Sequence, residues 1–167
     1  TGRLVAERLA GAGERPVLAG RSPEKLQALA SELGGLETAR GDVMRSNSVF
    51  ALVGEGDVLV TTVGPFSKWG EPAVRAAITA RAAYIDSTGE PTWIRRVFEE
   101  FDGPARRHGA ALMTAMGYDY VPGQLAGALA LEDAGEEAVR VDIGYYSLGQ
   151  GRPSAGTKES GVGVTLD

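Results

Sequence analysis

The strongest constraint on the fold is a regular alternation of short apolar runs with amphipathic segments. Residues 17–19 and 58–60 are apolar runs bounded by turn-forming residues, and the second is expected to be a strand buried on both faces. Between them, Ser22 and Pro23 form a helix start, followed by apolar residues at helical spacing over 26–33. The pattern predicts helices over residues 2–12, 23–33, 46–53, 71–82, 91–107 and 122–131, and strands over 15–20, 36–43, 57–63, 83–85 and 110–115.

Strand and helix units that recur in this way predict an α/β fold, a doubly wound parallel sheet with helices on both faces. In the helix over 91–107, the inward residues are expected to be Ile94, Val97, Phe98 and Phe101. The alternation of strands and helices changes near residues 120–135. Apolar and polar residues then alternate over 139–145, as in a strand with one solvent-exposed face. We therefore expect one domain over residues 1–120, and a connecting helix with the start of a second α/β domain over 121–167.

Composition excludes several classes of protein. The chain of 167 residues has no Cys, which excludes disulfide scaffolds and thiolate metal sites, and no metal site is predicted. Its net charge of −5 argues against binding to nucleic acid. No apolar run has the length of a transmembrane helix, so we expect a cytoplasmic protein, with peripheral membrane association left open. The chain begins at Thr1 and enters a helical pattern at once, which indicates a fragment that is incomplete at its N-terminus.

Arg21 is the candidate for cofactor choice. In a doubly wound sheet, ligands bind outside the carboxyl ends of the strands, and the loop after one strand meets the adenosine ribose. An acidic residue there would favour NAD, but this chain has Arg21, with Ser22 at a helix N-terminus and Lys25 one turn later. A charge-assisted bond to the 2′-phosphate changes preference by roughly 10- to 150-fold. These residues predict NADP as the cofactor; an ordinary solvated loop cation is the alternative.

Other loops at the same edge supply further candidates. Thr1 and Gly2 precede a helix, as in the end of a glycine-rich turn, and Asp42 lies near the end of the predicted strand 36–43. The bend after residue 62 could bring backbone close to a cofactor, or could be a structural turn with a buried Phe. Its candidate cofactor contacts are Val63, Gly64, Pro65 and Phe66. Polar residues also cluster over 86–90 and 117–123, and these residues could contact a substrate or the nicotinamide.

Several other mechanisms lack their residues. A short-chain dehydrogenase needs a Lys four residues after a catalytic Tyr, and no Tyr of this chain has one. Neither a Gly-x-Ser-x-Gly elbow nor a P-loop occurs. The single His, His108, follows two arginines at a helix end, where a surface cation is favoured.

Five stretches together resemble the saccharopine dehydrogenase-like oxidoreductases, in particular the branch that contains the mycobacterial trans-acting enoyl reductases. They are residues 1–6, 19–22, 62–66, 86–90 and 117–123, in the same order along the chain. The resemblance implies an NADP-binding Rossmann domain followed by an α/β substrate domain. It also implies that the first strand and the earlier glycines of the turn precede Thr1. We therefore expect residues 1–167 alone to bind NADP poorly and to be inactive.

The function that follows is hydride transfer between NADP(H) and a small or lipid-linked substrate, with enoyl reduction as one form. Tyr118 and Asp119 are the candidate proton donors, with Glu90 behind them. The alternative is a non-catalytic NADP(H)-binding sensor or scaffold, because no unmistakable catalytic dyad is visible. A homo-oligomer is left open, and the substrate is not identified by these residues.

Overall fold

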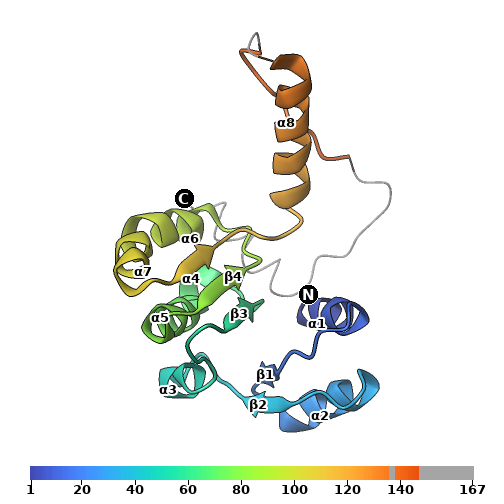
Figure 1. The fold of residues 1–167 in the computed structure, drawn as a ribbon, viewed down its shortest axis with the longest axis vertical. Coiled ribbons are helices and arrows are strands. Elements are labelled where there is room, and N and C mark those ends of the chain that lie inside the picture. The colour runs from blue at the N-terminus through green and yellow to red at the C-terminus, as the bar shows by residue number, and fades with distance from the viewer. Residues whose placement is uncertain (136–137, 147–167) are drawn as a thin grey trace.

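The chain forms short parallel strands that alternate with helices, as Figure 1 shows for the computed structural model. The structure describes residues 1–135 and 138–146. The elements are α1 (Gly2–Gly11), β1 (Leu18–Gly20), α2 (Pro23–Glu32), β2 (Thr38–Arg40), α3 (Ser46–Phe50), β3 (Val58–Thr61), α4 (Phe66–Trp69), α5 (Glu71–Ala80), β4 (Ala83–Asp86), α6 (Pro91–Arg96), a π-helical segment η1 (Val97–Phe101), α7 (Asp102–His108), β5 (Ala111–Met113) and α8 (Val121–Ala134). The predicted α/β class is confirmed.

Every strand pair is parallel, but the strands form two sheets. β1 pairs with β2, and β4 lies between β3 and β5. Between β1 and β3 there is no pairing among the described residues. In a doubly wound fold, ligands bind outside the carboxyl ends of the strands, at the point where the strand order reverses.

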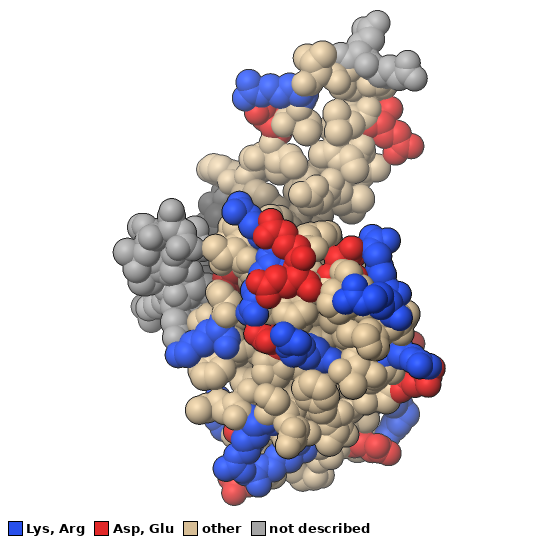
Figure 2. Space-filling model, turned by 90° about the vertical axis from the view of Figure 1, so that its left-hand side faces the viewer, with Lys and Arg blue, Asp and Glu red and all other residues tan. Residues whose placement is uncertain are grey.

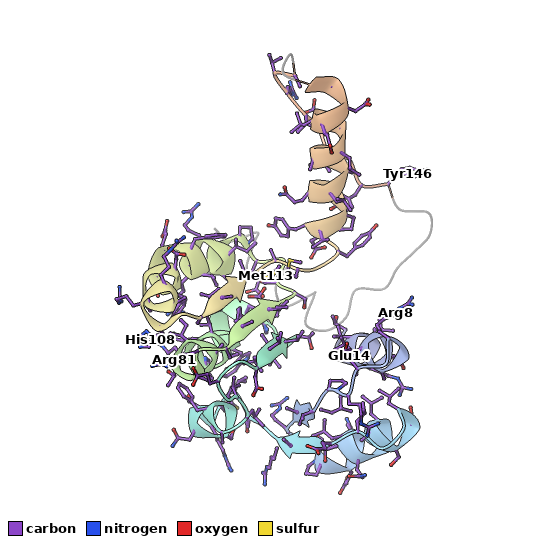
Figure 3. All side chains as sticks on the ribbon, in the orientation of Figure 1. Arg8, Glu14, Arg81, His108, Met113 and Tyr146 are labelled. Carbon is purple, nitrogen blue, oxygen red and sulfur yellow. The ribbon has the colours of Figure 1, made fainter. Side chains whose placement is uncertain are left out.

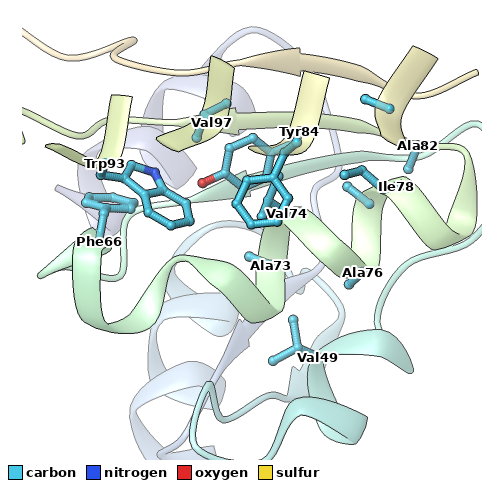
Figure 4. Close-up of a cluster of buried hydrophobic side chains, with 13 residues drawn as sticks. Val49, Phe66, Ala73, Val74, Ala76, Ile78, Ala82, Tyr84, Trp93 and Val97 are labelled. Carbon is cyan, nitrogen blue, oxygen red and sulfur yellow. The ribbon is translucent and has the colours of Figure 1, made fainter. Parts of the chain in front are cut away.

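The main core lies between the β3–β4–β5 sheet and helices α3 and α5–α7. Figure 4 shows Tyr84, Trp93, Phe66 and Val74 packed together there, and the exposed fraction of each is 6% or less. A smaller core lies between the β1–β2 sheet and helices α1 and α2. Its residues are Ala6, Leu18, Ala30 and Leu36, with the half-buried side chains of Leu26, Leu29 and Leu33 packed against it.

The prediction that β3 is buried on both faces is wrong. Val58 and Val60 are 60% and 40% exposed, whereas Leu59 packs against the core. Val60 is in register with Ile85 and, across β4, with Met113, which is 48% exposed. Figure 3 shows Met113 on the side of β5 away from α7. The described helices cover only the opposite face of this sheet, the face with Tyr84 and Leu112.

The long helix predicted over 91–107 is interrupted by the π-helical segment η1. Its buried residues are Trp93, Val97, Phe101 and Ala105, spaced by four, while Phe98 is 67% exposed. The prediction that Phe98 faces inward is therefore wrong. In an α-helix each residue turns by about 100°, so a strict spacing of four drifts by about 40° per step. The wider π turn absorbs this drift and keeps the four side chains on the core.

After β5 the chain leaves the sheet. α8 begins at Val121, close to the predicted domain boundary, and projects away from the two sheets (Figure 1). The strand predicted over 139–145 is wrong, because residues 138–146 form no strand. Its alternate apolar side chains pack instead on glycines of α8, and a Cβ on Gly127 would lie 3.0 Å from Ile143. The predictions for residues 147–167 lie outside the described residues.

Charges on the helical face are mixed in sign. Figure 2 shows Lys, Arg, Asp and Glu side chains interspersed over it. Glu71 accepts hydrogen bonds from Arg75 and from Arg96, which lower the pKa of its carboxyl group. These side chains are 32% to 57% exposed, so each pair contributes at most about 1 kcal/mol.

Candidate cofactor-binding and active site

Within each sheet, the loops that follow the strands lie at its carboxyl edge, because the strand pairs among the described residues are parallel. The N-terminus of α1 lies at the same edge. A Cβ on Gly2 would be 3.0 Å from Thr62 Oγ1, which places the first turn of α1 against the end of β3. The N-cap Thr1 makes no side-chain capping hydrogen bond. A helix N-terminus beside the break between the two sheets suits an anionic group.

Arg21 directly follows β1 and is exposed. Ser22 is the N-cap of α2 and Pro23 begins the helix, as predicted, although the Ser22 hydroxyl makes no capping bond. Within the described part of the chain, neither Arg21 nor Lys25 makes a side-chain hydrogen bond or ion pair. By contrast, Arg3 and Arg96 each bind two carboxylates. Two cations beside a helix N-terminus therefore face solvent at the carboxyl end of β1.

Asp42 lies just after β2, at the same edge, and is half-buried. Its carboxylate Oδ1 accepts a hydrogen bond of 3.0 Å from the Met44 backbone N–H. Its backbone N–H donates to Ser48 Oγ over 2.9 Å. The carboxylate thus stabilises the turn into α3, with one oxygen engaged in that turn.

The loop after β3 combines an exposed bend with a buried anchor. Val63 and Gly64 are exposed, the Gly64–Pro65 peptide is cis, and Phe66 is only 6% exposed, packed in the main core. The two interpretations of this loop are therefore compatible. Phe66 fixes the turn, while the backbone before it stays at the surface beside α1.

Asp86, at the end of β4, is the centre of a buried hydrogen-bond network. Its carboxylate is 1% exposed. It accepts hydrogen bonds from five donor groups at 2.7 to 3.0 Å: Tyr84 Oη, Trp93 Nε1, Thr114 Oγ1 and the backbone N–H groups of Thr88 and Ala115. Figure 4 shows the Tyr84 hydroxyl and the Trp93 nitrogen pointing toward one another. Burial, and then the Asp86 charge, raise the pKa of Tyr84.

This network ties together the loops after β4 and β5. Ala115 has a φ of 62°, a left-handed conformation that costs energy for a residue with a Cβ. Its N–H is held by Asp86 Oδ1 at 2.9 Å. The sequence singled out 86–90 as a polar cluster but did not identify Asp86, Trp93 or Thr114 as one unit. The only signal was polar residues directly after two strands.

Glu90 is buried, with 4% of its surface exposed. Its carboxylate accepts hydrogen bonds from the Phe66 N–H at 2.7 Å and the Ser67 N–H at 2.9 Å, and also from the Ser67 hydroxyl. Its own N–H donates to Thr88 Oγ1 at 3.0 Å. Glu90 therefore connects the loop after β4 to the loop after β3.

Tyr118 and Asp119 lie in the loop after β5. Tyr118 is 73% exposed, and its ring meets Tyr145 edge to face with 5.6 Å between centroids. A Cβ on Gly89 would be 2.5 Å from Asp119 Oδ2, so this carboxylate lies over the loop after β4. The structure thus brings Asp119 and Glu90 to neighbouring loops. His108 lies elsewhere, at the end of α7, where Nδ1 is 2.9 Å from the Pro104 carbonyl (Figure 3).

Parallel strands, a helix N-terminus at a break in strand order and cations after β1 define a dinucleotide-binding α/β domain. Residues 1–126 match the family described as "Saccharopine dehydrogenase NADP binding domain". The chain belongs to this family, and NADP is its cofactor. No helix in the described part of the chain combines the length and apolar character needed to span a membrane.

Relatives and a solved structure agree with the assignment. The chain is 37% identical over 133 residues to a Mycobacterium tuberculosis protein named provisionally as a trans-acting enoyl reductase; the match covers 75% of this chain and 31% of that protein. It is 33% identical over 129 residues to the trans-acting enoyl reductase of Mycobacterium ulcerans, covering 75% and 30%. The fold resembles saccharopine dehydrogenase (L-Glu forming) from Saccharomyces cerevisiae, with a TM-score of 0.63, 18% identity, and coverage of 77% and 28%. The chain thus spans about a third of the length of these curated relatives.

Proposed function

We propose that the protein is an NADP(H)-dependent oxidoreductase that reduces an activated C=C bond of a small or lipid-linked substrate, or runs the reverse reaction. When bound, NADPH supplies the hydride. The observation that carries the proposal is that two exposed cations, Arg21 and Lys25, lie at the carboxyl end of β1 with no carboxylate bound to them in the described part of the chain. The names of the relatives support the enoyl class of substrate.

The residues at the carboxyl edge suit a polyanionic dinucleotide. Arg21 and Lys25 would hold the 2′-phosphate, and the first turn of α1, from Thr1 and Gly2, would face the pyrophosphate. Asp42 and the Val63–Gly64 backbone would line the rest of the site. Uncapped N–H groups and unpaired cations attract phosphate, whereas an acidic residue in place of Arg21 would repel it.

For the proton that accompanies the hydride, we propose Tyr118 or Asp119. Both side chains reach the surface of the loop after β5, next to the other loops of the site. A hydroxyl or carboxyl group there can donate a proton to substrate carbon, and then recover it from water. The protein's part is to hold the two reactants in contact and to limit access of water.

The test is transfer of label in the full-length protein. With NADPH deuterated at the transferable position and an enoyl thioester as substrate, we expect deuterium in the saturated product, detected by mass spectrometry. The Arg21→Glu variant should lose this transfer at low cofactor concentration. Absence of label from the saturated product of every enoyl thioester tested, with NADPH bound tightly, would refute the reductase.

A non-catalytic NADP(H) sensor is the second candidate. Neither Tyr118 nor Asp119 has a hydrogen-bond partner within residues 1–135 and 138–146, so no acid–base pair is assembled there. A sensor predicts tight NADPH binding together with a partner whose affinity depends on the cofactor. The same labelled cofactor separates the two functions, because a sensor exchanges no hydrogen.

A further inference from the structure

Glu90 connects loops to which the proposed function gives different roles. The loop after β3 carries the candidate cofactor contacts, and the loops after β4 and β5 carry the candidate proton donors. The Glu90 carboxylate is directed toward the first loop, where it accepts from Phe66 N–H and Ser67 N–H at 2.7 and 2.9 Å. These groups are the first N–H donors of α4.

The carboxylate matches this position because it only accepts hydrogen bonds. Two backbone N–H groups and the Ser67 hydroxyl converge on its two oxygens, and only 4% of Glu90 is exposed. A buried N–H without an acceptor is costly, so removal of the carboxylate must release or shift this turn. The turn directly follows Val63 and Gly64, which are exposed at the carboxyl edge.

The other end of Glu90 is fixed as well. Its backbone starts α6, where its carbonyl accepts from the Ile94 N–H at 3.0 Å. Its N–H is held by Thr88, whose own N–H is held by Asp86. The Glu90 backbone is therefore held by hydrogen bonds within the loop after β4 and α6. From there its carboxylate reaches the more exposed loop after β3.

From this arrangement we propose that Glu90 is a positioning residue for the cofactor: it fixes the bend at Val63–Pro65 in the conformation that binds NADP(H). The inference rests on the proposed function, and it assigns Glu90 to cofactor affinity and not to proton transfer. Replacement of Glu90 should then raise the Kd for NADPH more than it lowers kcat.

The experiment compares Glu90→Gln with wild type and with Glu55→Gln, all as full-length protein. Glu55 is an exposed carboxylate with a long ion pair of 3.5 Å to Arg81, so its variant controls for the chemical change alone. Glu90→Gln keeps one acceptor oxygen. Its amide group, however, is itself a donor, and it would face the donor groups of Phe66 and Ser67. We expect the Kd for NADPH, from fluorescence titration, to rise about tenfold in Glu90→Gln and to be unchanged in Glu55→Gln.

A second readout does not depend on the cofactor. Hydrogen exchange of the peptide over 63–70 should be faster in apo Glu90→Gln, while peptides from β4 keep the wild-type rate. Ser67→Ala removes one donor and leaves both backbone bonds, so it should shift both readouts in the same direction by less. This milder variant serves if Glu90→Gln does not fold.

Three results would overturn the inference while the proposed function stands. One is unchanged exchange over 63–70 in both variants, and another is faster exchange with an unchanged Kd. The third is a fall in kcat at wild-type Kd, which would make Glu90 a proton donor. Failure of wild type itself to bind NADPH would overturn the proposed function as well, and is distinguished because the exchange measurement still stands.

Discussion

Replacement of Asp86 by Asn tests the buried network most directly. The change keeps the shape of the side chain but converts one acceptor oxygen to an amide donor. If that amide took the Oδ1 position, it would oppose two backbone N–H groups, from Thr88 and Ala115. At Oδ2 it faces the hydroxyls of Tyr84 and Thr114, which can turn and accept, and the Trp93 indole, which cannot. The amide should therefore face Trp93.

The expected cost follows from that geometry. Asp86→Asn removes the charge that assists all of these hydrogen bonds, loses one of them, and leaves a buried indole N–H opposite another donor. We expect the free energy of unfolding to fall by about 2 to 4 kcal/mol. In a Trp93→Phe background the indole N–H is absent, so Asp86→Asn should cost about 1 to 2 kcal/mol less there. Asp102→Asn, which breaks only an exposed pair with Arg106, should cost less than about 1 kcal/mol.

Urea unfolding followed by circular dichroism measures all the variants, because the signal does not depend on Trp93. The four proteins of the cycle give the coupling free energy between residues 86 and 93 directly. An Asp86→Asn variant as stable as Asp102→Asn would show that the carboxylate is not the centre of this network. An equal cost with and without the indole would show that the amide does not face Trp93.

Three further predictions concern the site and its support. Arg21→Ala should raise the Kd for NADPH by about 10- to 100-fold and leave that for NADH nearly unchanged; equal effects on both cofactors in fluorescence titration would contradict a 2′-phosphate contact. Tyr118→Phe should lower kcat by about 100-fold with the Kd for NADPH unchanged, and unchanged turnover would remove Tyr118 as a donor. Because burial raises the pKa of Tyr84, the folded state keeps this proton when the unfolded chain releases it above a pH of about 10. Stability should therefore be complete below that pH and fall above it by about 1.4 kcal/mol per pH unit, and Tyr84→Phe should lack this component; identical pH profiles of the two unfolding free energies would contradict it.

The sequence predicted the elements of the Rossmann-like part well because its signals are local. The helix start at Ser22 and the short apolar strands need only neighbouring residues to be recognised. Arg21 was placed at the carboxyl edge by the order of elements alone, and the structure puts it there.

The errors arose where distant parts of the chain decide the outcome. Exposure of Val58 and Val60 depends on which helices cover the sheet, and no local pattern contains that information. The segment over 139–145 has the alternation of a strand, but a strand also needs a partner, and here its side chains pack on α8. The Asp86 network joins residues up to 29 positions apart, so spacing could not reveal it.

The π turn at Val97–Phe101 sets the orientation of everything that follows in that helix. It lets Phe101 and Ala105 continue the buried row begun by Trp93. Loss of a single residue from this turn would leave a spacing of three between Val97 and Phe101, which a regular α-helix keeps on one face, so α7 would still direct Ala105 to the core. Loss of one residue from α7 itself, between Phe101 and Ala105, would instead rotate the rest of that helix by about 100°. The π turn is therefore the place in this helix where a change of length disturbs the core least.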